Sequence, residues 1–262
     1  MEGTAKVSVL ASVLEGGIGR VTLNRPESMN TFTLELAQEL NDALWAMEED
    51  ERVKVVVLDA AGKHFSTGID LKEFLAQERH ELREFLRIMD QHNFTLFRMA
   101  KPVVAAVQGY ALANGTGLAL ACDFIIAADN AVFGTTAVNV GLICLEPGYQ
   151  LSRWIGPKRA LQYVLTGEFI PACKAHEMGV VWKVVPQEAL LEEAMSFART
   201  LAEKSPLAVR TGKRSLQQME GLPLERAIEF AGERFAALGL SEDAKEGLDA
   251  FLQKRKPVWK ER

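Results

Sequence analysis

The stretch from Lys101 to Gly117 constrains the fold of this chain more than any other segment. An apolar run, residues 103–107, leads into a loop that contains glycine, and a second apolar run begins at Leu118. A strand followed by a glycine turn and a buried helix leaves the first N–H groups of that helix without intrahelical partners, and such a helix start attracts negative charge. We therefore expect the N–H groups of residues 114–116 to point out of the helix.

A second unit of the same kind lies upstream. Residues 53–58 are apolar without alternation, as expected for a strand buried on both faces, and residues 124–127 repeat this character. Residues 65–70 predict a tight turn, and Leu71 begins a helix. Because both units place a turn after a buried strand, two backbone N–H groups are expected to converge.

The first half of the chain alternates strands with helices. Two runs, residues 7–14 and 18–23, flank Gly16-Gly17 and predict a hairpin. Thr33 is predicted to cap a helix that runs to about Glu49, because apolar residues recur at helical spacing behind it. This alternation predicts parallel βαβ units and an α/β fold.

After Pro186 the sequence contains several helix-start signals, for example at Pro223 and Ser241, and no further strand-like run. We therefore divide the chain into a core, residues 1–195, and a C-terminal helical region, residues 196–262. A helical tail with little sheet left to pack on is expected to pack across its own core and against other subunits. This region is thus predicted to mediate oligomerisation.

Composition excludes several classes of function. The chain has 262 residues and a net charge of -5, which argues against a nucleic-acid groove, since phosphate binding needs clustered cations. Its three cysteines have neither paired spacing nor a Cys/His pattern, so we expect no metal, no disulfide and a reducing compartment. No leader or membrane-spanning segment is evident, which predicts a cytoplasmic protein without a membrane partner. Dinucleotide, Walker, zinc-protease and serine-hydrolase motifs are absent from the sequence.

Five segments in order resemble signatures of the crotonase (enoyl-CoA hydratase/isomerase) superfamily. They are residues 65–73 (Phe-Ser-Thr-Gly-Ile-Asp-Leu-Lys-Glu), 108–112 (Gln-Gly-Tyr-Ala-Leu), 121–127 (Ala-Cys-Asp-Phe-Ile-Ile-Ala), 164–168 (Val-Leu-Thr-Gly-Glu) and 250–257 (Ala-Phe-Leu-Gln-Lys-Arg-Lys-Pro). The resemblance implies a ββα spiral core with a C-terminal helical region, assembled as a trimer or a dimer of trimers. It also implies an acyl-CoA thioester as the ligand, with coenzyme A as part of the substrate and no other cofactor.

The resemblance further implies that the N–H groups of Ile69 and Asn114 hold the thioester oxygen. Each preorganised donor to a developing oxyanion can contribute about 3 kcal/mol. From the residues alone, glycine between a strand and a helix is also ordinary backbone geometry. Asp70 is predicted to cap the helix that begins at Leu71 rather than to act as an acid. The substrate-binding residues implied by the resemblance are Ile69, Asp70, Leu71, Lys72, Asn114, Phe251 and Lys254.

The nucleotide end of the ligand is expected to meet Lys72 near its phosphates. Phe251 and Lys254 lie one helical turn apart, so an aromatic ring could meet adenine while the ammonium group meets phosphate, in this subunit or a neighbouring one. The alternative is a solvated basic tail. Glu27 stands where relatives often place a basic residue, which weakens that side of the nucleotide site.

Two positions depart from the pattern of a family hydratase. Gly117 and Ala137 stand where the pattern has glutamates, and hydration needs one group for the water and another for the adjacent carbon. Glu146, in the loop where isomerases and dehalogenases of the superfamily often place a carboxylate, is the leading replacement; the alternative is an exposed glutamate that caps the next helix. Cys144 and Tyr149 in the same loop are predicted to serve packing.

We therefore predict an enzyme that stabilises a thioester enolate, with Ile69, Asn114 and Glu146 as its catalytic residues. A single carboxylate can remove a proton from one carbon and return it to another, so an enoyl-CoA isomerase-type shift is favoured. Decarboxylation of a malonyl-type thioester and atypical hydration are alternatives of the same class. A non-catalytic acyl-CoA-binding protein is the alternative from another class.

Overall fold

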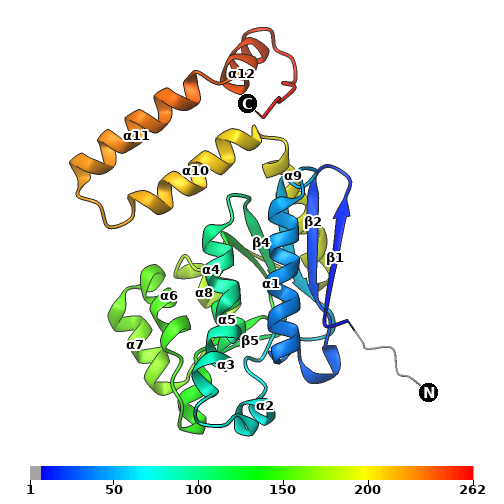
Figure 1. Ribbon diagram of the computed structural model, residues 1–262, viewed down its shortest axis with the longest axis vertical. Coiled ribbons are helices and arrows are strands. Elements are labelled where there is room, and N and C mark those ends of the chain that lie inside the picture. The colour runs from blue at the N-terminus through cyan, green and yellow to red at the C-terminus, as the bar shows by residue number, and fades with distance from the viewer. Residues whose placement is uncertain (1–6, 262) are drawn as a thin grey trace.

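The computed structural model describes residues 7–261, which form a six-stranded sheet, a smaller three-stranded sheet and the helices that cover them (Figure 1). The large sheet has the order β1-β2-β3-β4-β6-β9, in which only the β1/β2 pair is antiparallel. Its strands are β1 (Val9–Leu14), β2 (Ile18–Leu23), β3 (Val55–Ala60), β4 (Val103–Val107), β6 (Phe124–Ala128) and β9 (Lys183–Val185). The small sheet consists of β5 (Tyr110–Leu112), β7 (Val132–Gly134) and β8 (Phe169–Pro171).

The helices follow most of the start signals in the sequence. The Thr33 hydroxyl accepts a hydrogen bond from the Leu36 N–H at 3.2 Å, as the predicted N-cap should. Ser241 caps its helix in the same way. The helices are α1 (Leu34–Glu49), α2 (Leu71–Ala76), α3 (Leu82–Met89), α4 (Gln91–Arg98), α5 (Asn114–Ala121), α6 (Leu145–Ile155), α7 (Pro157–Thr166), α8 (Ala172–Glu177), α9 (Leu190–Ala202), α10 (Pro206–Met219), α11 (Leu224–Gly239) and α12 (Glu242–Leu252), with short 3₁₀ turns η1 (Pro26–Ser28), η2 (Thr136–Val140) and η3 (Gln187–Ala189).

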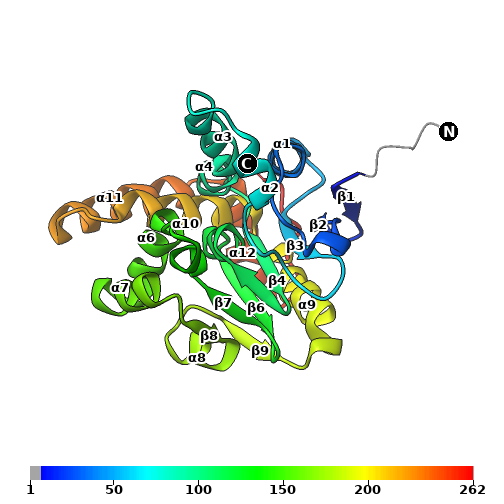
Figure 2. The same ribbon diagram turned by 90° about the horizontal axis from the view of Figure 1, so that it is seen from below.

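The central strands of the large sheet, β2, β3, β4 and β6, are buried on both faces, which explains their continuous apolar sequences, whereas the edge strand β1 is largely exposed. In β3 every residue from Val55 to Ala60 is buried. Helix α1 covers one face and α9 covers the other (Figure 2). Hydrophobic burial on two faces holds the sheet rigid, and the loops that follow β3 and β4 therefore begin from fixed points.

The C-terminal helices α10, α11 and α12 project away from the sheet (Figure 1). Helix α10 is tied to the core by the Lys213 ammonium, which donates to the Asp123 carboxylate at 2.7 Å. Helix α11 has no buried residue, so the expectation that the tail packs across its own core holds for α9 and is wrong for α11. The predicted division at residue 195 falls inside α9, whose residues on both sides of that point pack on the sheet. Within residues 7–261 no helix is both long and apolar enough to span a bilayer.

Candidate active site

Two backbone turns lie side by side where β3 and β4 end. The Ser66 N–H donates to the Tyr110 carbonyl at 3.1 Å, and the Leu112 N–H donates to the Ser66 carbonyl at 2.9 Å. Gly68 has a φ of +90°, and a Cβ added there would lie 2.8 Å from the Cβ of Ala113. Because only glycine tolerates both the conformation and this approach, the turn in residues 65–70 can press against the start of α5.

Ile69 and Asn114, whose N–H groups are the predicted donors, line one cavity. The neighbours of Ile69 are fixed by Phe32, whose N–H donates to Gly68 and whose carbonyl accepts from Asp70, both at 2.8 Å. Ile69 itself makes no such bond, and Asn114 is the first residue of α5, so neither N–H has a hydrogen-bond acceptor within residues 7–261. Both residues line a cavity of about 770 Å³. The geometry supports the predicted pair of unpaired donors.

Glu146, on the first turn of α6, lines the same cavity as these donors. One of its carboxylate oxygens, Oε2, lies 2.6 Å from the position that a Cβ on Gly117 would occupy. Glu146 therefore fills the space that any side chain at position 117 would need. Its other oxygen, Oε1, accepts a hydrogen bond from the Gln150 side chain, whereas Oε2 is buried without a partner among the described residues.

The environment of Glu146 suits proton transfer near neutral pH. The pKa of Glu146 is raised from 4.5 to about 7. Burial is the largest cause, the nearby Asp90 carboxylate also raises the pKa, and the hydrogen bond from Gln150 lowers it. A carboxyl group with a pKa near the working pH can act as a base or an acid. The alternative prediction, an exposed glutamate that caps a helix, is wrong.

Asp90 is a site residue that sequence reasoning missed. It joins α3 to α4 and lines the same cavity as Ile69 and Glu146. The Asn114 side-chain amide donates to Asp90 Oδ1 at 3.0 Å. Burial raises the pKa of Asp90, and this hydrogen bond lowers it. No motif marks Asp90, because its place depends on how α4 packs beside α5.

Other predicted residues have mixed outcomes. Asp70 caps α2 by accepting from the N–H groups of Lys72 and Glu73 at 3.0 and 3.3 Å, as expected. The side chain of Lys72 is exposed. Ala137 and Cys144 line the main cavity, and Cys144 is buried as expected. Leu71 also lines it.

Three predicted residues lie apart from this group. Tyr149 is 70% exposed, so the prediction that it serves packing is wrong for the chain described here. Phe251 is 81% exposed and Lys254 is also exposed, at the end of α12. Helix α12 lies at the opposite end of the molecule from α2 (Figure 1), so a single chain does not bring Phe251 and Lys254 to the turn at Ile69.

A second cavity, of about 760 Å³, lies on the other side of the two carboxyl groups. Asp90 and Glu146 line it as well, together with aromatic residues of α4 and α6. At its rim, Arg153 forms an ion pair with Glu220, which joins α6 to the end of α10. The aromatic residues are Phe94, Phe97, Tyr149 and Trp154. The carboxyl pair therefore stands between two hollows.

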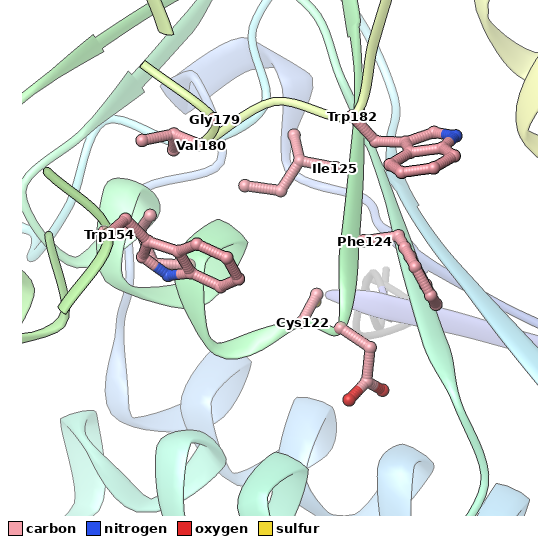
Figure 3. Close-up of a pocket in the computed structure, with 9 residues that line it drawn as sticks. Cys122, Phe124, Ile125, Trp154, Gly179, Val180 and Trp182 are labelled. Atoms are coloured by element: carbon pink, nitrogen blue, oxygen red, sulfur yellow. The ribbon is translucent and has the colours of Figure 1, made fainter. Parts of the chain in front are cut away.

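A smaller cavity of about 290 Å³ adjoins the second one beside β6 (Figure 3). Trp154 and Trp182 lie on opposite sides of it. Its cysteine, Cys122, is buried, and burial raises the pKa of the thiol. Its carboxylate, Asp123, accepts from Lys213 and from the Val103 N–H. These groups are already paired or inert, so this cavity has no evident reacting group.

The main cavity thus combines two unpaired backbone donors with a carboxyl group whose pKa is near 7. The donors can stabilise negative charge on a carbonyl oxygen, and the carboxylate can remove a proton from the adjacent carbon. Within residues 7–261 no cluster of His, Cys, Asp and Glu could hold a metal ion. The arrangement is suited to enolate chemistry through backbone donors.

The chain is similar to known proteins over nearly its whole length. A family model described as enoyl-CoA hydratase/isomerase matches residues 14–262. The chain is 38% identical to a probable mitochondrial enoyl-CoA hydratase of Dictyostelium discoideum, over 94% of this chain and 88% of that protein. It is 37% identical to a crotonyl-CoA hydratase of Syntrophomonas wolfei, over 89% of this chain and 91% of that protein.

Among solved structures, the fold is similar to that of an enoyl-CoA hydratase from Mycobacterium smegmatis. The TM-score is 0.93 at 35% identity, over 97% of this chain and 99% of that one. The predicted crotonase fold, with its C-terminal helical region, is thereby confirmed. The chain belongs to the enoyl-CoA hydratase/isomerase family, the crotonase superfamily that its five sequence segments resemble.

Proposed function

We propose that this protein is an acyl-CoA enzyme that shifts a double bond, with Glu146 as the group that moves the proton. The proposal rests on one observation above all. The carboxylate of Glu146 occupies the space beside Gly117, 2.6 Å from where a Cβ would be, although it comes from a different helix. A carboxylate therefore stands close to the position that the family hydratase pattern fills from residue 117.

In the proposed reaction, the thioester oxygen accepts hydrogen bonds from the N–H groups of Ile69 and Asn114. The Glu146 carboxylate removes a proton from the carbon next to the thioester, and the electron pair of the C–H bond moves toward the thioester oxygen. The two donors stabilise the resulting enolate. The proton then returns to the carbon at the far end of the dienolate, which completes the shift of the double bond. One carboxyl group is sufficient for both transfers.

The experiment uses a panel of enoyl-, dienoyl- and malonyl-type CoA thioesters, with products identified by mass spectrometry and NMR. Glu146→Gln should lower turnover of the best enoyl substrate by about 10²–10⁴-fold with little change in affinity. Glu35→Gln is a matched control, because Glu35 is also the second residue of its helix and is exposed. Turnover at the parent rate in Glu146→Gln would remove Glu146 from the mechanism.

Hydration is the second candidate. It needs two groups, and Asp90 supplies a second carboxyl in the same cavity as Glu146. The relatives named above carry hydratase names. Formation of a hydroxyacyl product from the enoyl thioester would favour this candidate. Release of CO₂ from a malonyl-type thioester, insensitive to Glu146→Gln, would indicate decarboxylation, and binding without any turnover would indicate a binding protein.

The proposal includes coenzyme A binding and assembly. Lys72 of one chain would meet the phosphates, while Phe251 and Lys254 would come from a neighbouring subunit, because α12 lies far from the turn in its own chain. Helix α11 carries exposed apolar side chains such as Ile228 and Phe235, which suit an interface in a trimer or a dimer of trimers. Light scattering of the assayed sample at micromolar concentration tests this, and an active monomer would refute it. A cytoplasmic location, expected from the sequence, is part of the same proposal and is tested by cell fractionation.

A further inference from the structure

Asp90 lies at the start of a helix but does not cap it with its side chain. It is the residue before the first turn of α4, and aspartate at such a position ordinarily caps the helix with its side chain. The side chain of Asp90 makes no capping hydrogen bond. It turns instead to Asn114, whose side-chain amide donates to Oδ1 at 3.0 Å. Helix capping therefore does not account for this carboxyl group.

The second oxygen of Asp90, Oδ2, has no hydrogen-bond partner among residues 7–261, and the residue lines both large cavities. Glu146 has the same two properties: it lines both cavities, and its Oε2 is unpartnered within the same residues. Two carboxyl groups thus line both cavities, each with one oxygen that accepts from an amide and one without a partner among the described residues, and the Asp90 carboxylate is close enough to raise the pKa of Glu146.

The groups around this pair do not neutralise it. Within the described residues no Lys, Arg or His nitrogen lies within 4.0 Å of either carboxylate. On α6, Arg153 pairs with Glu220 from the end of α10. On α4, the ring of His92 is buried against Phe32. Cys144, before α6, is buried and uncharged at neutral pH because burial raises its pKa.

Two carboxylates without a cation repel each other in a desolvated site, so the pair retains a proton where isolated groups would not. Such a pair contains a base and an acid at the same time. Such an arrangement lets separate groups carry out the two proton-transfer steps of one reaction.

We propose that Asp90 is the second proton-transfer group of this site and works as a pair with Glu146. The inference rests on the proposed function and changes its second step. Glu146 takes the proton from the carbon next to the thioester, so an O–H bond forms as the C–H bond breaks. The single proton of the pair exchanges between the two carboxyl groups, and the step starts from the form in which Asp90 holds it. Asp90 gives this proton to the far carbon, so a C–H bond forms as its O–H bond breaks. A proton then passes from Glu146 to Asp90 and restores the starting state.

The activity test combines Asp90→Asn with heavy water. In the parent protein the hydrogen added at the far carbon comes from Asp90, which equilibrates with solvent, so the product should carry deuterium there. Asp90→Asn can still accept from Asn114 but cannot supply the proton, so turnover should fall by about 10²–10⁴-fold and more of the substrate's own hydrogen should be retained. Asp42→Asn, an exposed aspartate of α1, is the control. An unchanged rate and an unchanged deuterium content would overturn the proposal.

A second test does not depend on activity. Titration of the Glu146 carboxyl carbon by NMR in the free, folded protein should show a lower midpoint in Asp90→Asn than in the parent, because one negative charge has been removed. Asp42→Asn should leave the midpoint unchanged. An unchanged midpoint in Asp90→Asn would disprove the pair. If the parent protein converts no enoyl thioester, the proposed function fails, while this titration still decides whether Asp90 and Glu146 are coupled.

Discussion

The two walls of the main cavity are built in different ways. The donor wall, formed by residues 65–70 and the start of α5, consists of backbone groups held by hydrogen bonds between neighbouring segments. The carboxyl wall, formed by Asp90 and Glu146, consists of side chains from separate helices that meet in a desolvated space. A backbone N–H remains a donor when the side chain of its residue changes, whereas the position and the pKa of a buried carboxyl group depend on the side chains packed around it.

Ionisation of Glu146, in the carboxyl wall, should destabilise the folded protein. Glu146 ionises near 4.5 in the unfolded chain and only at about 7 in the folded protein. Between these values the folded state holds more protons, so the free energy of unfolding should decrease as pH rises from about 4.5 to about 7 and stay low above that range. A shift of this size corresponds to about 3 kcal/mol.

Gln at position 146 cannot ionise, so the free energy of unfolding of Glu146→Gln should not show this decrease. The free energy of unfolding of the variant minus that of the parent should therefore be about 3 kcal/mol larger at pH 8 than at pH 4.5. Urea denaturation at both pH values measures the effect. Glu35→Gln, at the same place in α1 but exposed, should not show it. Parallel pH profiles for parent and Glu146→Gln would contradict the idea that this wall carries a destabilising ionisation.

The next prediction concerns Gly117 of α5, where a side chain would contact Glu146. A Cβ on Gly117 would lie 2.6 Å from Glu146 Oε2 and 3.3 Å from Cγ of Pro147, so Gly117→Ala must displace the carboxylate. Misplacement of a reacting group by about 1 Å costs about 10²-fold, and turnover should fall by that factor while acyl-CoA still binds. Gly212→Ala is the matched control, since its Cβ would meet nothing within 4 Å in α10. Full activity in Gly117→Ala would mean that the position of Glu146 does not matter.

The contact between a side chain at position 117 and Glu146 also determines which variant could restore the glutamate that the hydratase pattern has at position 117. A glutamate at position 117 would meet Glu146 before it reached the cavity, so Gly117→Glu requires Glu146→Ala in the same variant. The two positions exclude each other because they share one volume.

The smallest effect is expected on the donor wall. Ile69→Ala keeps the backbone N–H, and Ile69 is only half-buried, so turnover should stay near the parent value and affinity should fall by about tenfold or less. Steady-state kinetics with the best thioester separates the two quantities. Gly68→Ala is the contrasting variant, because its φ of +90° and its 2.8 Å approach to Ala113 would force the turn to move. A large loss of turnover in Ile69→Ala would show that the side chain, rather than the N–H, is the active part.

Much of the fold could be predicted because its signals are local. A cap such as Thr33 or Asp70 depends on an N–H two or three residues ahead, and a buried strand such as β3 shows its environment in its own residues. The packing of the tail was less predictable. Apolar residues at similar spacing pack on the sheet in α9 but are exposed in α11. The spacing of apolar residues indicates which face of a helix is apolar, but it does not indicate which other element that face will contact.

The family and the two turns with their candidate donors, Ile69 and Asn114, could be predicted from the sequence, because they depend on motifs and on backbone geometry close along the chain. The entry of Glu146 into the space beside Gly117, with Asp90 lining the same cavity, could be seen only in the folded chain. These side chains come from α6 and from the junction of α3 and α4, far apart in sequence. Their meeting and their shifted pKa values arise from burial, which depends on packing between elements rather than on any neighbour in the chain.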